Sequence, residues 1–573
     1  FANAMTENSG KGKCAVCGID ASQFCSACKT IRYCGAEHQK KHWKIHKLEC
    51  RPYAIGNADD VGRYLYATRD ITAKTVIFTE TPLVVGPKWY LSELEESSPI
   101  VPCVGCFTPT RIGGNTCPRC RWPVCAEACA GLDNPKLHAL ECPILMLGPG
   151  PKKSNDLKAL LDYYRTDALV VLKCLMLQRK FPKKWTELMD MQSHEIERLG
   201  SELYQDAEKR IVSYLLQNFI GPLKSLEKEK NDNILSKSDV ETLHKICGII
   251  ETNYMCINLL NGLELSGIFY TACMMEHSCI PNNYFSFDHN NGFKISVIAG
   301  RDIKKGEHLK IMYSNMLWGT QMRQEHLQMT KHFLCRCERC TDPTELGTYL
   351  SGLKCMGPEL DSCGGVQLPQ DPLDPKTQWT CNKCPMKVSS EEVRYLMSQM
   401  AEEVDVLLTK KPTVTQIEEL VEKLSQFLHE NHYHLFNLKH SLIQLYGTQI
   451  GYRLDQLTTA QLQEKLKMCD ELLLICDKLD PYTIRLSLYV GIILYEKQSV
   501  LVEASKRTFN QQNGSTENES DLALDNFKLA RDCLLRAAEV LKKELDTIGG
   551  AKLSDAVIKA ISNLDSLISN NPP

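Results

Sequence analysis

The segment CMMEHSCIPNN, residues 273–283, places a glutamate, a histidine and a cysteine side by side. An apolar run at residues 268–270 precedes it, and a strand-like alternation at residues 284–287 follows it. Taken alone, Ser-Cys-Ile-Pro-Asn is good turn chemistry, and an isolated cysteine is most often a small buried side chain. The rest of the chain decides between that interpretation and a functional one.

Length and composition limit the class of protein. A chain of 573 residues exceeds what one hydrophobic core usually organises, which indicates several domains. A formal net charge of -3 gives no global reason to wrap nucleic acid or to coat an acidic membrane. No apolar run reaches the roughly 18 residues of a membrane span. Residues 1–4 before Met5 are interpreted as an expression remnant, and the start shows no signal peptide. We therefore expect a soluble, monomeric protein of the cytoplasm or the nucleus.

The spacing of the 28 cysteines points to metal, because disulfides are rare in a reducing compartment. Near the start, four short Cys/His pairs supply enough ligands for two closed tetrahedral zinc sites. These residues are Cys14, Cys17, Cys25, Cys28, Cys34, His38, His46 and Cys50. We expect His42, between two of the ligands, to lie on an exposed basic face of a helix.

The same order of pairs returns about ninety residues later, which indicates an internal repeat. The second set is Cys103, Cys106, Cys117, Cys120, Cys125, Cys129, His138 and Cys142. A further set, Cys355, Cys363, Cys381 and Cys384, predicts a zinc ribbon that holds one or two ions. The seven cysteines outside these clusters, such as Cys174, Cys256 and Cys533, are expected to be buried or inert.

Several motifs resemble those of one family in chain order. YCGAEHQKKHWKIHKLEC resembles the second half of a MYND zinc finger, with His38 where the family usually has cysteine, and the second finger is a looser match. VGRYLYATRDITAKTVIFTETPLVV resembles the opening of a SET domain. TNYMCI, EHSCIPN, KKGEHLKIMY and FLCRCERC then match later SET motifs. The chain is identified as a member of the SET and MYND (Smyd) lysine methyltransferase family, of the arthropod SmydA-like type with an extra N-terminal finger.

The resemblance implies how the ligands are shared. In the first finger one ion takes Cys14, Cys17, Cys34 and His38, and the other takes Cys25, Cys28, His46 and Cys50. The second finger repeats this interleaved pattern. Three thiolates in FLCRCERC, namely Cys335, Cys337 and Cys340, need a fourth ligand. Cys279 is expected to supply it from residues 273–283, here called the opening segment. Full occupancy of all clusters would give about seven zinc ions.

The implied fold is α+β, a split SET β-fold with an inserted MYND finger, a post-SET zinc site and an all-α, tetratricopeptide-like C-terminal domain. Amphipathic patterns such as DALVVLKCLMLQRKF predict a helical insert, Asp480-Pro481 predicts a helix break, and NQQNGSTENES predicts a loop. The expected parts are an N-terminal finger at 5–52, SET segments at 53–100 and 266–330, the second finger at 101–143, the helical insert at 144–265, the post-SET motif at 331–345, the ribbon at 346–388 and the helical domain at 389–573.

The implied activity is S-adenosylmethionine-dependent methylation of lysine in histone or non-histone proteins. Such a reaction needs mainly a neutral amine held in line with the methyl group, and a narrow aromatic channel beside a cationic cofactor lowers the pKa of lysine. The resemblance implies that Tyr313 is catalytic and that Phe333 stacks on the adenine. The implied cofactor-binding residues are Gly62, Arg63, Tyr64, Asn253, Cys273, Met275, Glu276, His277, Tyr313 and Phe333.

Three residues depart from the family pattern and keep a second function open. Tyr64 replaces a glycine of the cofactor loop, Glu276 replaces an asparagine, and Lys331 replaces a tyrosine of the channel wall with a charge that repels a cationic substrate. The alternative is a weak or inactive scaffold, such as a transcriptional corepressor, whose fingers bind proline-containing peptides. The basic run HQKKHWKIHK could contact nucleic acid, but such a run is usually the solvated face of a finger helix.

Overall fold

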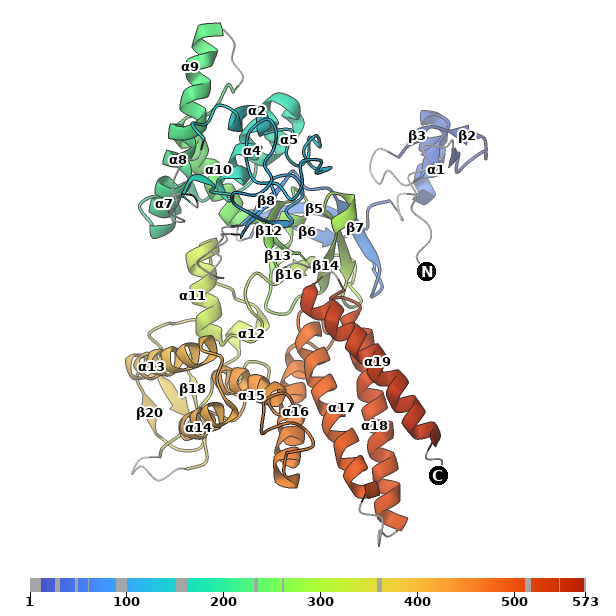
Figure 1. The fold of residues 1–573 in the computed structure, drawn as a ribbon, viewed down its shortest axis with the longest axis vertical. Helices are drawn as coiled ribbons and strands as arrows, with labels where there is room; N and C mark the ends of the chain where they lie inside the picture. Colours follow the sequence, from blue (N-terminus) through green and yellow to red (C-terminus); the bar gives the residue numbers. More distant parts are fainter. Residues whose placement is uncertain are drawn as a thin grey trace.

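The computed structural model describes residues 12–25, 31–46, 50–59, 61–88, 100–150, 160, 162–230, 235–259, 262–357, 363–510, 517–545 and 547–570. The first finger lies apart from the other domains in Figure 1. It consists of two antiparallel strand pairs and one helix: β1 (Gly12–Lys13) with β2 (Asp20–Ala21), β3 (Gln23–Phe24) with β4 (Arg32–Tyr33), and α1 (Ala36–His46). Its buried core is small and consists mainly of cysteines, so the finger depends on its metal ligands for a fold.

Short sheets form the SET domain. The predicted strands are present as β7 (Val76–Glu80), β8 (Val84–Pro87) and β14 (Asn283–Asp288). β15 (Lys294–Ala299) alternates buried and partly exposed residues, as expected for a strand with one face on a core. The sheets are β5 (Tyr53–Ala58) with β6 (Gly62–Ala67), β14-β15-β7, β11 (Met255–Asn258)-β12 (Glu264–Ile268)-β8, and β13 (Glu276–His277) with β16 (Lys310–Ile311).

The pair β13 and β16 is parallel and joins the opening segment to the strand before Tyr313. Glu276 is opposite Lys310, and His277 is opposite Ile311. This pairing, together with hydrogen bonds from Tyr313 to His277 and Met275, holds the segment beside the candidate site.

The second finger packs against the helical insert. It contains β9 (Ile100–Pro102), β10 (Pro109–Arg111) and α2 (Cys142–Leu145). The insert contains α4 (Ala168–Lys180), α5 (Pro182–Met189), α6 (Glu195–Arg198), α7 (Glu202–Ala207), α8 (Ser213–Leu215), α9 (Gly221–Lys230) and α10 (Val240–Asn253).

Two expectations for the insert need correction. Residues 168–177 of α4 are all buried, so this helix is central and not amphipathic, because the sheet strand β8 and helices α5 and α10 pack around it. The helical part ends at Asn253, and β11 and β12 belong to the SET sheet, so the expected boundary at residue 265 is too late.

The closing segment contains α11 (Thr320–Lys331) and α12 (Glu338–Thr341), and a four-stranded antiparallel ribbon follows. The ribbon strands are β17 (Leu353–Lys354), β18 (Val366–Pro369), β19 (Trp379–Cys381) and β20 (Lys387–Val388). In Figure 1 α11 and α12 lie between the SET domain and the C-terminal helices, whereas the ribbon strands β18 and β20 lie beside α13 and α14.

The C-terminal part is helical, as predicted. Its helices are α13 (Ser390–Thr409), α14 (Val414–Ser425), α15 (Tyr433–Leu445), α16 (Thr459–Leu479), α17 (Ser487–Asn510), α18 (Glu517–Leu541) and α19 (Ile548–Asn570). Reciprocal capping boxes begin α13, α14 and α16. α16 ends before Asp480-Pro481, as expected, whereas the predicted loop is shorter because α18 already begins at Glu517; residues 511–516 lie outside the described part.

Among the described helices, none combines the length and the hydropathy that crossing a membrane requires.

Candidate zinc sites and cleft

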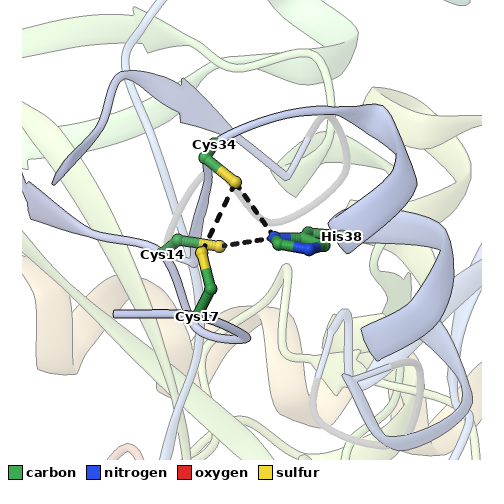
Figure 2. A group of neighbouring side chains, drawn as sticks. All are labelled: Cys14, Cys17, Cys34 and His38. Carbon is green, nitrogen blue, oxygen red and sulfur yellow. Dashed lines mark hydrogen bonds between the residues drawn. The ribbon is translucent and has the colours of Figure 1, made fainter. Parts of the chain in front are cut away.

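The first ligand set meets in the N-terminal finger. Figure 2 shows Cys14, Cys17, Cys34 and His38 pointing toward one another. Their donor atoms all lie within 4.8 Å of one another. Nδ1 of His38 is 3.0 Å from Sγ of Cys34 and 3.6 Å from Sγ of Cys14. Three thiolates and one imidazole at such distances are a donor set typical of structural zinc.

The other ligand set of this finger is described only in part. Sγ of Cys25 and Sγ of Cys50 are 3.5 Å apart, and His46 is buried. Cys28 lies outside the described residues. His42 is half-buried and not on an exposed face as expected, because its Nδ1 is 3.0 Å from the hydroxyl of Tyr33 and its ring stacks on His46.

The second finger brings its ligands together in the interleaved pattern that the resemblance implies. One group is Cys103, Cys106, Cys125 and Cys129, and the other is Cys117, Cys120, His138 and Cys142. Nε2 of His138 is 3.4 Å from Sγ of Cys120. On the other side of the ring, Nδ1 lies 3.3 Å from a carboxylate oxygen of Glu141, the arrangement that orients histidine ligands in metal sites.

Cys279 lies next to the cysteines of the post-SET motif FLCRCERC, residues 333–340. Its Sγ is 3.5 Å from Sγ of Cys340, and both lie in one group with Cys335 and Cys337. The cysteine of the opening segment therefore connects the SET core to its closing segment. Four thiolates on one zinc ion carry excess negative charge. Neighbouring cationic side chains partly compensate for this charge.

A buried charge network surrounds this group. Arg323 and Arg339 are both fully buried, and each pairs with Glu345, at 2.7 and 3.0 Å. Nη2 of Arg323 also lies 3.5 Å from Sγ of Cys340. Burial by itself would raise the pKa of Glu345, but the two guanidinium groups outweigh it and lower that pKa to about 2. Sequence reasoning did not find these three residues, because their meeting depends on tertiary packing.

The four ribbon cysteines form one group. Sγ of Cys355 is 3.6 Å from Sγ of Cys384, and Sγ of Cys363 is 3.5 Å from Sγ of Cys381. One group accommodates one ion, so full occupancy corresponds to about six zinc ions and not about seven. The cysteines outside the clusters, including Cys174 and Cys533, are buried or partly buried, as expected.

A cleft of about 540 Å³ lies between the SET core and the C-terminal helices. A volume of this size suits a small ligand or a few side chains. Aromatic residues provide much of its wall: Tyr254, Tyr284, Phe285, Phe287 and Tyr313. Of the expected cofactor-binding residues, Asn253, Cys273 and Tyr313 line the cleft, whereas Gly62, Arg63, Tyr64, Met275, Glu276, His277 and Phe333 do not.

Tyr313 is fixed by the opening segment. Its backbone N–H donates to Nδ1 of His277 at 2.9 Å, and its hydroxyl donates to the carbonyl of Met275 at 2.5 Å. Phe333 lies edge-on to the Tyr313 ring, with centroids 6.5 Å apart. Burial raises the pKa of Tyr313 and lowers the pKa of His277 to about 3. The tyrosine therefore keeps its proton, and the histidine is neutral.

Tyr64 and Glu276, two of the residues that depart from the family pattern, both contact His308. Sequence reasoning missed His308. Glu276 accepts from Nδ1 of His308 at 2.9 Å and pairs with Lys310 at 3.3 Å. The ring of Tyr64 stacks on His308 with centroids 4.1 Å apart. Gly62, the first residue of β6 and two residues before Tyr64, has a φ of 68°, which favours glycine.

The other expected cofactor-binding side chains also have protein partners. Arg63 pairs with Asp190 at 2.5 Å, in a contact that is partly exposed. The side chain of Asn253 donates to the carbonyls of Gln192 and Ile249, both at 2.7 Å. Cys273 lies beside Tyr270, and its Sγ is 3.1 Å from the Tyr270 carbonyl. Burial raises the pKa of Cys273 to about 12, so its thiol stays protonated.

Lys331 projects into the cleft from the last turn of α11. Its ammonium donates to the carbonyls of Glu251 and Thr252, at 3.1 and 2.6 Å, and lies 5.7 and 5.8 Å from the ring centroids of Tyr254 and Tyr313. Burial lowers the pKa of Lys331 to about 8. The repulsion of a cationic substrate that was expected from Lys331 is therefore partly offset. Carbonyls in the last turn of α10 accept hydrogen bonds from the ammonium, and two aromatic faces lie close to it.

Comparisons with known proteins agree with these features. The family model of the MYND finger matches residues 14–50, and that of the SET domain matches residues 62–314. The chain is 30% identical over 336 residues to SET domain-containing protein SmydA-8, isoform A, of Drosophila melanogaster, which covers 58% of this chain and 64% of that protein.

Two further relatives carry enzyme names. Histone-lysine N-methyltransferase ASHR1 of Arabidopsis thaliana is 25% identical over 368 residues, 62% of this chain and 68% of that protein. N-lysine methyltransferase SMYD2 of Homo sapiens is 25% identical over 258 residues, 42% of this chain and 50% of that protein. The chain thus matches the MYND finger and the SET domain, and over part of their length it is similar to SET and MYND proteins such as SmydA-8.

Proposed function

We propose that the protein is a protein-lysine methyltransferase that uses S-adenosylmethionine and receives its target amine in the cleft beside Tyr313. The position of Tyr313 carries the proposal, because this residue is held by the segment 275–277 and also faces the aromatic cleft. The names of the ASHR1 and SMYD2 relatives support the same activity. The site would act in the cytoplasm or the nucleus.

The chain's own residues explain how an amine would be prepared. The walls formed by Tyr254, Phe285 and Phe287 are apolar and favour the neutral form of a lysine that enters between them. The Tyr313 hydroxyl donates a hydrogen bond to the Met275 carbonyl, so the lone pairs on its oxygen are free to accept a hydrogen bond from the amine. The tyrosine would thus orient the amine without removing its proton.

The residues beside the cleft can hold the methyl donor. The Arg63–Asp190 pair is partly exposed, and such pairs contribute at most about 1 kcal/mol, so Arg63 can exchange Asp190 for a ligand carboxylate. The carboxylate of Glu276 retains lone pairs for a ligand ammonium, and Phe333 offers an aromatic face for a purine. S-adenosylmethionine supplies the electrophilic methyl group on its sulfonium when bound.

The scaffold alternative has one specific observation in its favour. Tyr64, Glu276, His308 and Lys310 form a connected network beside the glycine turn of β6, and each of these side chains already has a protein partner. The methyl donor would have to displace part of this network. If the network instead excludes the donor, the SET fold would serve as a scaffold, and the fingers would bind peptide partners.

Calorimetry with S-adenosylmethionine separates the two functions. We expect the wild-type protein to bind the donor, and Glu276→Asn, which restores the family residue, to keep or tighten binding. If the wild-type protein gives no heat while Tyr64→Gly combined with Glu276→Asn gains binding, the scaffold function is correct. Tyr313→Phe serves as a control, since it should leave donor affinity largely unchanged.

A further inference from the structure

On the basis of the proposed lysine methylation, we propose that the cleft selects a target lysine with an acidic side chain close to it in the substrate. The geometry points to Arg485 as the residue that binds this carboxylate. Arg485 belongs to the wall that the C-terminal helices contribute to the cleft.

The backbone around Arg485 is held rigidly. Asp480 is buried and accepts hydrogen bonds from the backbone N–H groups of Ile484, Arg485 and Leu486, at 2.8, 2.6 and 2.9 Å. This turn connects α16 to α17 and leaves the Arg485 side chain exposed in the cleft. A side chain presented by a fixed backbone loses less entropy when it binds.

The guanidinium of Arg485 is open for a ligand. Within the described part of the chain, it has no hydrogen bond and no ion pair. The guanidinium is exposed to solvent on its open side, but the walls of the cleft partly desolvate it. This desolvation lowers the pKa of Arg485, although the nearby charges of Glu544 and Asp480 act in the opposite direction. A guanidinium in a concave, partly desolvated position binds a carboxylate well, because its planar donors match the two oxygens.

The other charges of the cleft favour the same partner. Lys331 and Lys543 contribute two further cations, and Lys543 lies over the ring of Tyr284 at 5.1 Å. Two carboxylates also line the cleft: Glu251 pairs with Arg198 at 2.7 Å, whereas Glu544 accepts from the Ser487 hydroxyl and keeps its charge. The three cations, Lys331, Arg485 and Lys543, outnumber these two carboxylates, so the lining has a positive balance although the protein's net charge is -3.

A positive cleft repels a segment in which basic residues surround the target lysine, as like charges do at any interface. It attracts a segment in which aspartate or glutamate lies near that lysine. We therefore infer that the substrates are proteins with mixed acidic and lysine segments, and that consecutive-basic tails of the kind found in histones bind poorly.

The test is peptide binding to the full-length protein by fluorescence anisotropy, without methyl donor. The probes are labelled peptides with one central lysine and neutral spacers, each with a single glutamate at one of the neighbouring positions, and matched peptides with arginine there. We expect at least one glutamate position to bind about tenfold more tightly than its arginine match, a difference of about 1.4 kcal/mol. Raising the salt concentration should reduce this preference.

Two charge-reversal variants locate the effect. Arg485→Glu should abolish the preference for glutamate, while Lys506→Glu, the same charge change at an exposed residue of α17 outside the cleft, should retain it. Equal binding of all peptides, or equal loss in both variants, would overturn the inference. Methyl transfer is measured separately: transfer without the preference rejects only this inference, and the preference without transfer rejects only the enzymatic function.

Discussion

The two fingers have the same order of ligands but different surroundings. In the first finger the ligands Cys17, Cys34 and His38 are at least partly exposed, and Trp43 of α1 is 43% exposed. In the second finger all four residues of the group that contains His138 are buried, and Trp122 is fully buried against the helical insert. The same metal chemistry thus supports one finger that stands alone and one that is part of a larger core.

This difference indicates separate roles for metal and packing. Zinc ligation supplies the folding free energy of a small finger that cannot build a core. Where a finger also packs on a domain, its metal site becomes part of that domain's stability. We therefore expect damage to the first finger to stay local and damage to the second to spread.

The largest expected effect is the loss of one ligand from the buried group. Cys117→Ser should release a zinc ion and reduce hydrogen-exchange protection through the second finger and into α4, because that helix belongs to the same core. Native mass spectrometry counts the ions, and hydrogen exchange maps the loss. The matched variant Cys14→Ser should lose one ion and protection only within residues 12–46.

Equal spreading of the two changes would contradict the comparison. If Cys14→Ser reduced protection in the SET domain, the first finger would be coupled to it. If Cys117→Ser kept its full zinc content, the grouping of Cys117 with His138 would be wrong.

The next effect concerns the tryptophans. Trp122 packs on Tyr163, Tyr164 and Phe219, with ring centroids 5.3 to 6.4 Å away. Trp122→Ala should reduce the free energy of unfolding by about 3–5 kcal/mol, the usual cost of removing a large buried side chain. Trp43→Ala should change it by no more than about 0.5 kcal/mol. Chemical denaturation measures both, and similar losses would show that Trp43 is packed against another part of the protein.

A smaller effect is expected from the carboxylate behind the zinc ligand. Glu141 lies 3.3 Å from Nδ1 of His138 and 3.6 Å from the ammonium of Lys173 in α4. Glu141→Gln keeps the shape of the side chain but removes its charge. We expect the free energy of unfolding to fall by about 1–3 kcal/mol and zinc binding to weaken by about 10- to 100-fold. Competition with a chelator measures the affinity. Unchanged affinity would mean that Glu141 orients neither His138 nor its zinc site.

Much of the metal architecture could be predicted from sequence, because short ligand spacings are local. The pairs in the fingers and the partnership of Cys279 with Cys340 follow from counting ligands and from the family resemblance. The ribbon ion count could not be settled by counting, since Cys355 and Cys363 do not form a tight pair in sequence and join Cys381 and Cys384 only in the folded ribbon.

Features that depend on distant packing could not be predicted. His308 meets Glu276 through the parallel pairing of β13 and β16, and a two-residue strand leaves little sequence signal. Lys331 was expected to repel a substrate, but the end of α10 receives its ammonium, which depends on how two helices approach each other. The exposed Arg485 is likewise defined by the cleft and not by any motif.

The most direct test of the proposed function is transfer of an isotope-labelled methyl group from S-adenosylmethionine to lysine in peptides and extract proteins, measured by mass spectrometry for the wild-type protein and for Tyr313→Phe. The account predicts methyl-lysine with the wild-type protein and, because the amine is no longer oriented, a rate lower by about a hundredfold for Tyr313→Phe, with donor binding retained. Equal transfer by the two proteins would contradict the role of Tyr313, and absence of transfer by the wild-type protein would contradict the proposed activity.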